Sequence, residues 1–274
     1  MVDEAFFPAY QVSREENPLF AVLFALPPAE SSRKAKIGIV AKDPAGNEIF
    51  SSIPCHIRSK KFRNDTMRIS QSFLDQKMPE FRHLCPDLKS DASTLDVFIY
   101  VNEKLREKNW NEIMAFCEKS EPRQLWKGSF LRMANAAPMA MFGDRRTYVF
   151  EGKKISHSTH LGIDLASTVN ATIEASNSGI VVFSGNIGIY GNSILIDHGL
   201  GLFSFYAHLS SMAVNAGDAV SKGQPIGNSG ISGLAGGDHL HFGLVVGKKF
   251  VNPQEWWDPH WIKDNIVKKI DLSS

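Results

Sequence analysis

The chain has 274 residues, of which 43% are hydrophobic and 22% charged, and these are ordinary values for a folded globular protein. Lysine and arginine number 30 against 29 for aspartate and glutamate, so there is no cationic excess of the kind that binds nucleic acids, and we expect no nucleic-acid partner. No apolar run approaches the roughly 20 residues that a membrane-spanning helix needs. The first residues, Met1–Glu4, lack the basic and apolar regions of a secretion signal.

Residues 1–62 are predicted to form a small β module. An apolar run over 20–26 ends at Pro27, and the alternation of apolar and charged residues over 34–42 is typical of a half-buried strand. A turn signal and a return strand follow over 43–57. The turn resembles the hairpin of bacterial immunoglobulin-like modules, so we expect such a module here. The face of the first strand that we expect to be buried consists of Ala35, Ile37, Ile39 and Ala41.

Residues 63–135 change to the three- and four-residue apolar repeat of helices. Ser70 is placed to cap a short helix that ends before Pro79. A longer amphipathic segment is predicted over 95–116, with a bend near Asn109. This middle part of the chain is therefore predicted to be a helical region.

After a linker near residue 135 the chain becomes rich in short strands bounded by glycine, which predicts an antiparallel β domain over 136–258. Residues 259–274 are predicted to be a C-terminal tail. The predicted fold class is α+β with several domains, in which an all-β antiparallel domain follows a small immunoglobulin-like β module and a helical region.

Five side chains of the β domain suggest metal chemistry. His239 and His241 project from the same face of a predicted strand, because side chains alternate along a strand. His160 and Asp164 are four residues apart, and His208 lies between these two clusters in the sequence. Zinc prefers imidazole and carboxylate ligands, and a catalytic site uses three of them. We expect His160, Asp164 and His241 to bind the metal, and His208 and His239 to transfer protons.

Four segments of this domain, in this order and at fitting separations, resemble the LytM/lysostaphin-type zinc metallopeptidases. They are Phe142–Arg146 (FGDRR), His160–Asp164 (HLGID), Tyr206–Leu209 (YAHL) and Gly237–Phe242 (GDHLHF). The resemblance covers residues 138–258 and extends, more weakly, to the accessory region of envelope-bound members. It implies a catalytic cleft in an antiparallel sheet and one Zn²⁺ per chain. It also implies that His160, Asp164 and His241 are the ligands and that His208 and His239 are the catalytic pair.

The resemblance further implies a zinc metalloendopeptidase that hydrolyses peptide cross-links or stems of bacterial peptidoglycan. Such an enzyme works on the periplasmic side of the cell envelope, which implies a targeting segment or membrane anchor that has been removed from this sequence. A homodimer, or a heterodimer with a paralogue, is a further expectation. Arg145 and Arg146 fit either a substrate contact or surface charge. The tyrosine with which some members hold the oxyanion has no assignable equivalent in this sequence.

Two other functions are compatible with parts of the sequence. A regulator of another wall hydrolase would keep the metal site but contact a protein partner instead of cleaving a bond. A carrier module would explain the turn over 217–224, but it has no use for the histidine clusters. Outside those clusters, His198 is predicted to be a turn residue, and His157 an exposed loop residue.

Overall fold

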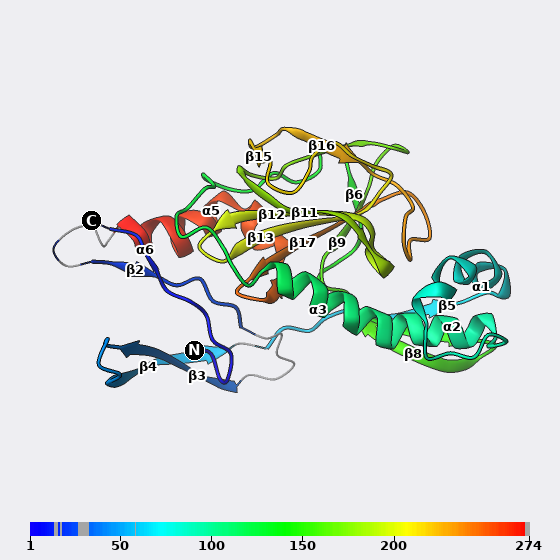
Figure 1. Ribbon diagram of the computed structural model, residues 1–274, viewed down its shortest axis with the longest axis horizontal. Coiled ribbons are helices and arrows are strands. Elements are labelled where there is room, and N and C mark those ends of the chain that lie inside the picture. The colour runs from blue at the N-terminus through cyan, green and yellow to red at the C-terminus, as the bar shows by residue number, and fades with distance from the viewer. Residues whose placement is uncertain (14–15, 17, 27–32, 58, 272–274) are drawn as a thin grey trace.

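The computed structural model describes residues 1–13, 16, 18–26, 33–57 and 59–271. Its central element is a sheet of eight strands in which all neighbours are antiparallel (Figure 1). In spatial order the strands are β15 (Ala219–Val220), β11 (Gly179–Ile187), β12 (Gly191–Gly199), β13 (Leu202–Leu209), β17 (Leu240–Val246), β9 (Ile163–Ala166) and β6 (Ala137–Ala140), with β18 (Lys249–Val251) beside β17. The predicted antiparallel β domain is thereby confirmed.

Both faces of this sheet are covered, and every residue of β13 and β17 is buried. On one face Tyr206 packs in a core that also contains Trp256. On the other face Phe203 and Phe205 pack in a core that also contains Phe98 from the helical region. Strands that are buried on both sides read as continuous apolar runs, which explains why β13 and β17 lack a polar alternation.

The last helix of the helical region lies along the second face, and the earlier helices lie beyond the end of the central sheet (Figure 1). It consists of α1 (Gln71–Lys77), the 3₁₀ turn η1 (Met78–Leu84), α2 (Thr94–Tyr100), the π-helical turn η2 (Val101–Leu105) and α3 (Arg106–Phe116). The predicted cap is confirmed, because the side chain of Ser70 accepts a hydrogen bond from the backbone of Phe73. The long helix is interrupted by the π turn, and the bend near Asn109 stays a prediction.

Residues 64–68, which we expected to be helical, instead form a strand. This strand, β5 (Asn64–Arg68), pairs in parallel with β7 (Arg145–Phe150), and β7 pairs with β8 (Lys153–Thr159). Residues on both sides of position 135 therefore share one sheet and one core. The domain boundaries at 62, 135 and 258 stay predictions.

The immunoglobulin-like module is not confirmed. The described residues before position 62 form two two-stranded sheets, β1 (Tyr10–Gln11) with β2 (Phe20–Ala21) and β3 (Arg33–Lys42) with β4 (Glu48–Ile57). On the β3 face that we expected to be buried, Ile37 is buried, but the relative exposure of Ile39 is 54% and Ala41 is exposed. Among the residues of this face that the structure describes, Ile37 alone joins a hydrophobic core. Pro27, Pro28 and the side chain of Ala35 lie outside the described residues.

Two smaller groups complete the fold. The sheet of β10 (Thr172–Glu174), β16 (Pro225–Asn228) and β14 (Ser211–Met212) and the short turn η3 (Gly188–Tyr190) lie beside the central sheet. The C-terminal segment consists of α4 (Pro253–Trp257), α5 (Pro259–Ile262), η4 (Lys263–Val267) and α6 (Lys268–Asp271). Among the helices in the described ranges, none is both long and apolar enough to cross a bilayer.

Candidate active site

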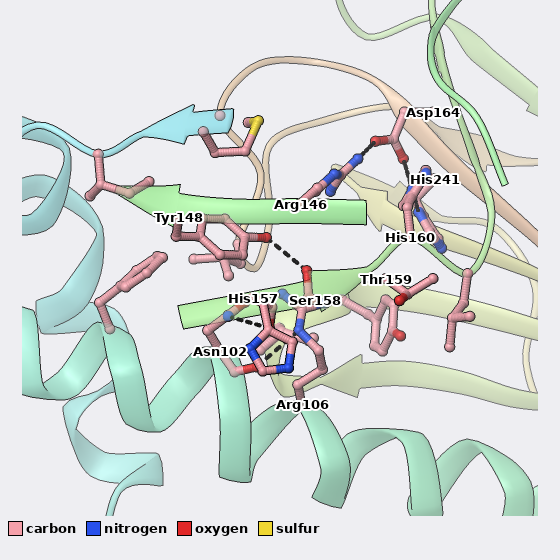
Figure 2. A pocket seen from close by; sticks show the side chains of 18 of the residues that line it. Asn102, Arg106, Arg146, Tyr148, His157, Ser158, Thr159, His160, Asp164 and His241 are labelled. Carbon is pink, nitrogen blue, oxygen red and sulfur yellow. Dashed lines mark hydrogen bonds and ion pairs between the residues drawn. The ribbon is translucent and has the colours of Figure 1, made fainter. Parts of the chain in front are cut away.

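Strand pairing brings the three predicted metal ligands together. Asp164 on β9 is the direct cross-strand partner of His241 on β17, so their side chains share one face of the sheet. His160 lies in the loop that leads into β9. Oδ1 of Asp164 lies 2.9 Å from Nε2 of His160 and 2.9 Å from Nδ1 of His241, and these two nitrogens are 3.0 Å apart (Figure 2). All three residues are buried.

The hydrogen bonds around these side chains set their protonation states. Nδ1 of His160 lies 2.9 Å from the carbonyl oxygen of Met141, which can only accept, so Nδ1 carries the proton and Nε2 offers a lone pair. Burial lowers the pKa of His241 to about 4, so this ring is neutral at pH 7. Burial acts to raise the pKa of Asp164, but the close contacts of this carboxylate with His160 and His241 hold its pKa well below the usual value. The site therefore offers ring nitrogens of two histidines and the oxygen of one carboxylate.

This donor set fits a divalent cation. The ligand atoms of His160, Asp164 and His241 all lie within 4.8 Å of one another. The three facing atoms are Nε2 of His160, Oδ1 of Asp164 and Nδ1 of His241, and at most one proton, on Nδ1 of His241, can lie between them. Nε2 of His241 is buried without a partner among the described residues. A cation at the centre would satisfy all three acceptors, and metal ligands must be deprotonated in this way.

The FGDRR segment fixes the ring of His160. Oδ2 of Asp144 accepts hydrogen bonds from the backbone of Met141 at 2.9 Å and from Arg63 at 2.8 Å. Gly143, whose φ is +87°, makes the turn between Met141 and Asp144. Asp144 is buried, so the carbonyl of Met141 is held where it can accept the proton of His160.

The second arginine of this segment reaches the same carboxylate. Nη2 of Arg146 on β7 lies 3.0 Å from Oδ2 of Asp164, the oxygen that does not face the histidines (Figure 2). Burial opposes the charge on Arg146, but the carboxylate of Asp164 outweighs it and raises the pKa of Arg146. Arg146 is therefore not an exposed surface charge, but it lines the cleft, so a contact with substrate stays a prediction.

His208 and His239 also meet at this site, although strand alternation alone would separate His208 from it. His241 pairs with Ala207, so an extended strand would direct His208 to the opposite face. The backbone of His208 is left-handed, with a φ of +63°, and this turns the side chain back. The ring centroid of His208 lies 4.8 Å from that of His239 and 5.9 Å from that of His241.

Each of these two histidines has one nitrogen available for proton transfer. Nδ1 of His208 donates to the carbonyl of Ser232 at 2.9 Å, and Nδ1 of His239 donates to the carbonyl of Gly237 at 2.8 Å. Nε2 therefore carries the lone pair in both rings. Burial, together with the neighbouring histidines, lowers the pKa of His208 well below its ordinary value, so it is neutral at pH 7.

The five side chains line a cleft of about 790 Å³. Helix residues that sequence reasoning missed form its opposite wall, among them Asn102, Arg106 and Trp110. Asn102 is buried, and Figure 2 shows Asn102 and Arg106 extending from the helix toward β8. No local motif marks these residues, because only the docking of the helices onto the sheet brings them to the cleft.

Two tyrosines that were not assigned from the sequence also line the cleft. Oη of Tyr148 lies 3.0 Å from Oγ of Ser158, and the ring of Tyr190 lies 5.6 Å from that of His241. His157 is exposed as predicted, but it lies on β8 rather than in a loop. The turn predicted at His198 is wrong, because this residue is fully buried near the end of β12.

A cluster of potential metal ligands beside two further histidines suits a metal-dependent hydrolase, and this is the class to which the site points. More narrowly, residues 158–253 match the sequence model of Peptidase family M23. This part of the chain is a domain of that family.

Relatives share this domain and not their whole length. Peptidoglycan DD-endopeptidase ShyA of Vibrio cholerae is 40% identical over 93 residues, which are 34% of this chain and 22% of that protein. Murein hydrolase activator NlpD of Salmonella typhimurium is 37% identical over 106 residues, which are 38% of this chain and 28% of that protein. The matched part of this chain therefore spans less than a third of either relative.

One solved structure resembles nearly the whole chain. It is the crystal structure of a candidate M23 peptidase from Pseudomonas aeruginosa, which has a TM-score of 0.57 and 18% identity. The alignment covers 92% of this chain and 85% of that one. At this identity the likeness concerns the fold alone.

Proposed function

We propose that the protein is a zinc metalloendopeptidase that hydrolyses peptide cross-links or stems of bacterial peptidoglycan. One observation carries the proposal: a buried cluster of His160, Asp164 and His241 lies beside two further histidines, each of which has its Nδ1 held by a backbone carbonyl. The M23 domain and the name of the Vibrio relative support peptidoglycan as the substrate class. Such a substrate places the protein in the cell envelope.

His160, Asp164 and His241 would hold one Zn²⁺ per chain. When bound, Zn²⁺ would supply Lewis-acid polarisation of the peptide carbonyl and lower the pKa of a water molecule. His208 and His239 supply the proton transfers, because each presents a lone pair at Nε2 and has its other nitrogen fixed by a backbone carbonyl. One of them accepts the proton of the attacking water, and a protonated imidazole then donates to the leaving amine.

The helices and the β7–β8 hairpin give the cleft two walls, between which an extended peptide would lie across the metal site. Water is partly excluded from such a site, which strengthens each electrostatic interaction in it. Tyr148 and Tyr190 line the cleft, and their hydroxyl groups are the candidates for stabilising the oxyanion.

The alternative is a regulator of another wall hydrolase, and the likeness to the activator NlpD favours it. Digestion of purified peptidoglycan by the zinc-loaded chain alone separates the two. We expect mass spectrometry of the soluble fraction to show fragments with a new amine and a new carboxyl group. Release of no fragment by the zinc-loaded chain would contradict the enzymatic function and favour the regulator.

A further inference from the structure

The loop between β16 and β17 controls both proton-transfer histidines. Its residues Ser232 and Gly237 provide the carbonyl oxygens that accept from Nδ1 of His208 and of His239. These two hydrogen bonds decide which nitrogen of each ring is free in the cleft. The geometry of the loop backbone therefore matters for catalysis, although neither carbonyl touches the substrate.

A lysine of the helical region clamps this loop. Nζ of Lys77, the last residue of α1, donates to the carbonyl of Ile231 at 3.1 Å and to that of Gly233 at 3.2 Å. These two residues flank Ser232 on either side. The side chain of Lys77 is 11% exposed, and Glu80 lies 3.8 Å away with a side chain that is 56% exposed.

Burying an ammonium group costs free energy, and hydrogen bonds must offset that cost. Here the two loop carbonyls provide that compensation, so this contact ties the loop to the end of the helix. The helix end itself is fixed, because Leu74 and Met78 are fully buried in the core on the second face of the sheet. Lys77 thus connects a rigid element to a loop whose outer residue, Ile231, is 57% exposed.

The loop has further attachments, but none of them fixes the same carbonyls. Oγ of Ser232 donates to the backbone of Leu209 at 2.8 Å, and the backbone of Leu234 donates to that of Ile189 at 2.8 Å. Gly233 approaches Gly191 so closely that an added Cβ would lie 2.4 Å from its nitrogen. These contacts hold the loop against the sheet, and Lys77 adds the contact from the helical side.

We propose that Lys77 is a positioning residue for His208, and that the helical region must be docked through it for the active site to work. The inference rests on the proposed peptidase function for its effect on turnover, but its structural part concerns the tautomer of His208 and can be measured without any reaction. It assigns residues 71–77 a role in catalysis that lies outside the M23 domain.

The test compares Lys77→Met, which removes the donors and keeps the length of the side chain, with the conservative Lys77→Arg. Lys104→Met is the matched control, because the side chain of Lys104 is 65% exposed on the same helical region and makes an ion pair with exposed Asp87. Nitrogen NMR of the ¹⁵N-histidine-labelled full chain, with and without zinc, reports which nitrogen of His208 carries the proton. A His208→Gln sample assigns the signal.

We expect wild type, Lys77→Arg and Lys104→Met to keep the proton on Nδ1, and Lys77→Met to shift toward the Nε2–H form. With peptide substrate, kcat of Lys77→Met should fall by about 10- to 100-fold, because small misplacements of a catalytic group have effects of that size. KM and zinc content should stay unchanged. Lys77→Arg should recover much of the loss in kcat.

An unchanged His208 signal in Lys77→Met overturns the proposal, whatever happens to turnover. A shifted signal in a protein whose wild type cleaves nothing leaves the positioning role standing and contradicts the proposed peptidase instead. If Lys77→Met does not fold, as judged by its thermal melt, Lys77→Gln keeps one amide donor and serves for the same comparison.

Discussion

Arg146 donates to one oxygen of Asp164 over 3.0 Å, while the other oxygen of this carboxylate faces His160 and His241. The arginine therefore orients one of the three proposed metal ligands, Asp164, through the oxygen that faces away from the two histidines. Groups that orient metal ligands in this way typically contribute about 10- to 100-fold in metal affinity.

We predict that Arg146→Gln weakens zinc binding by about that factor, because the glutamine cannot supply the charge that aligns Asp164. Competition with a zinc chelator measures the affinity. Arg123→Gln is the control, since the Arg123 side chain is 75% exposed and pairs only loosely, at 3.6 Å, with Glu121. Equal zinc affinities in wild type and Arg146→Gln would show that the contact is not needed for binding.

Gly162 leaves room for the imidazole of His241. An added Cβ would lie 2.6 Å from both Cε1 and Nε2 of that ring and 2.7 Å from the carbonyl oxygen of Phe242. Because the backbone oxygen cannot move easily, we predict that Gly162→Ala displaces His241, lowers zinc content and costs about 1–3 kcal/mol of stability. Zinc analysis and urea unfolding measure these effects. Gly236→Ala is the control, because a Cβ there meets open space, and a Gly162→Ala protein with full zinc content would contradict the prediction.

Motif spacing was sufficient to predict which side chains come together, but not how they are held. The separation of His160 and Asp164 and the alternation around His241 are local patterns, and the sheet converts them directly into one cluster. The left-handed backbone of His208 has no local signal, since histidine is not a residue that requires it. The partner of Arg146 depends on the pairing of distant strands.

The overall fold was predictable to a similar degree. Glycine-bounded strands and the cap at Ser70 follow from local rules, and the structure has both. The strand at Asn64–Arg68 was missed because its partner β7 lies about 80 residues further on, and parallel pairing leaves no turn signal. The exposure of Ile39 was missed because alternation predicts a strand but not what covers it.

His198 provides a pH test of the core. Nδ1 donates to the carbonyl of Ser178 at 2.8 Å, Nε2 lies 2.7 Å from Oγ of Ser204, and burial lowers the pKa to about 4. An unfolded histidine has a pKa of about 6.5. Between these two pKa values the unfolded chain binds a proton that the native protein does not. The contribution of neutral His198 to the free energy of unfolding is therefore complete above pH 6.5 and is lost as the pH falls toward 4.

We predict that the titration of His198 lowers the free energy of unfolding by about 3 kcal/mol between pH 7 and pH 4. Urea unfolding over that range should therefore show a flatter pH dependence for His198→Gln than for wild type. His260→Gln is the control, because the side chain of His260 is 91% exposed. If stability falls with pH in the same way in wild type and His198→Gln, His198 is not the source of this pH dependence.

The division of labour between His239 and His241 is the central claim, and zinc content measured together with the rate of peptide release from purified peptidoglycan tests it most directly. Loss of one general acid–base group typically lowers the rate by about 10²–10⁴-fold. We predict that His239→Ala and His208→Ala each fall by that order with zinc retained, and that His241→Ala loses zinc. Because the two histidines act on one reaction, the double variant should fall by less than the product of the single effects. Near wild-type turnover in His239→Ala, or equal loss of zinc from His239→Ala and His241→Ala, would contradict the account.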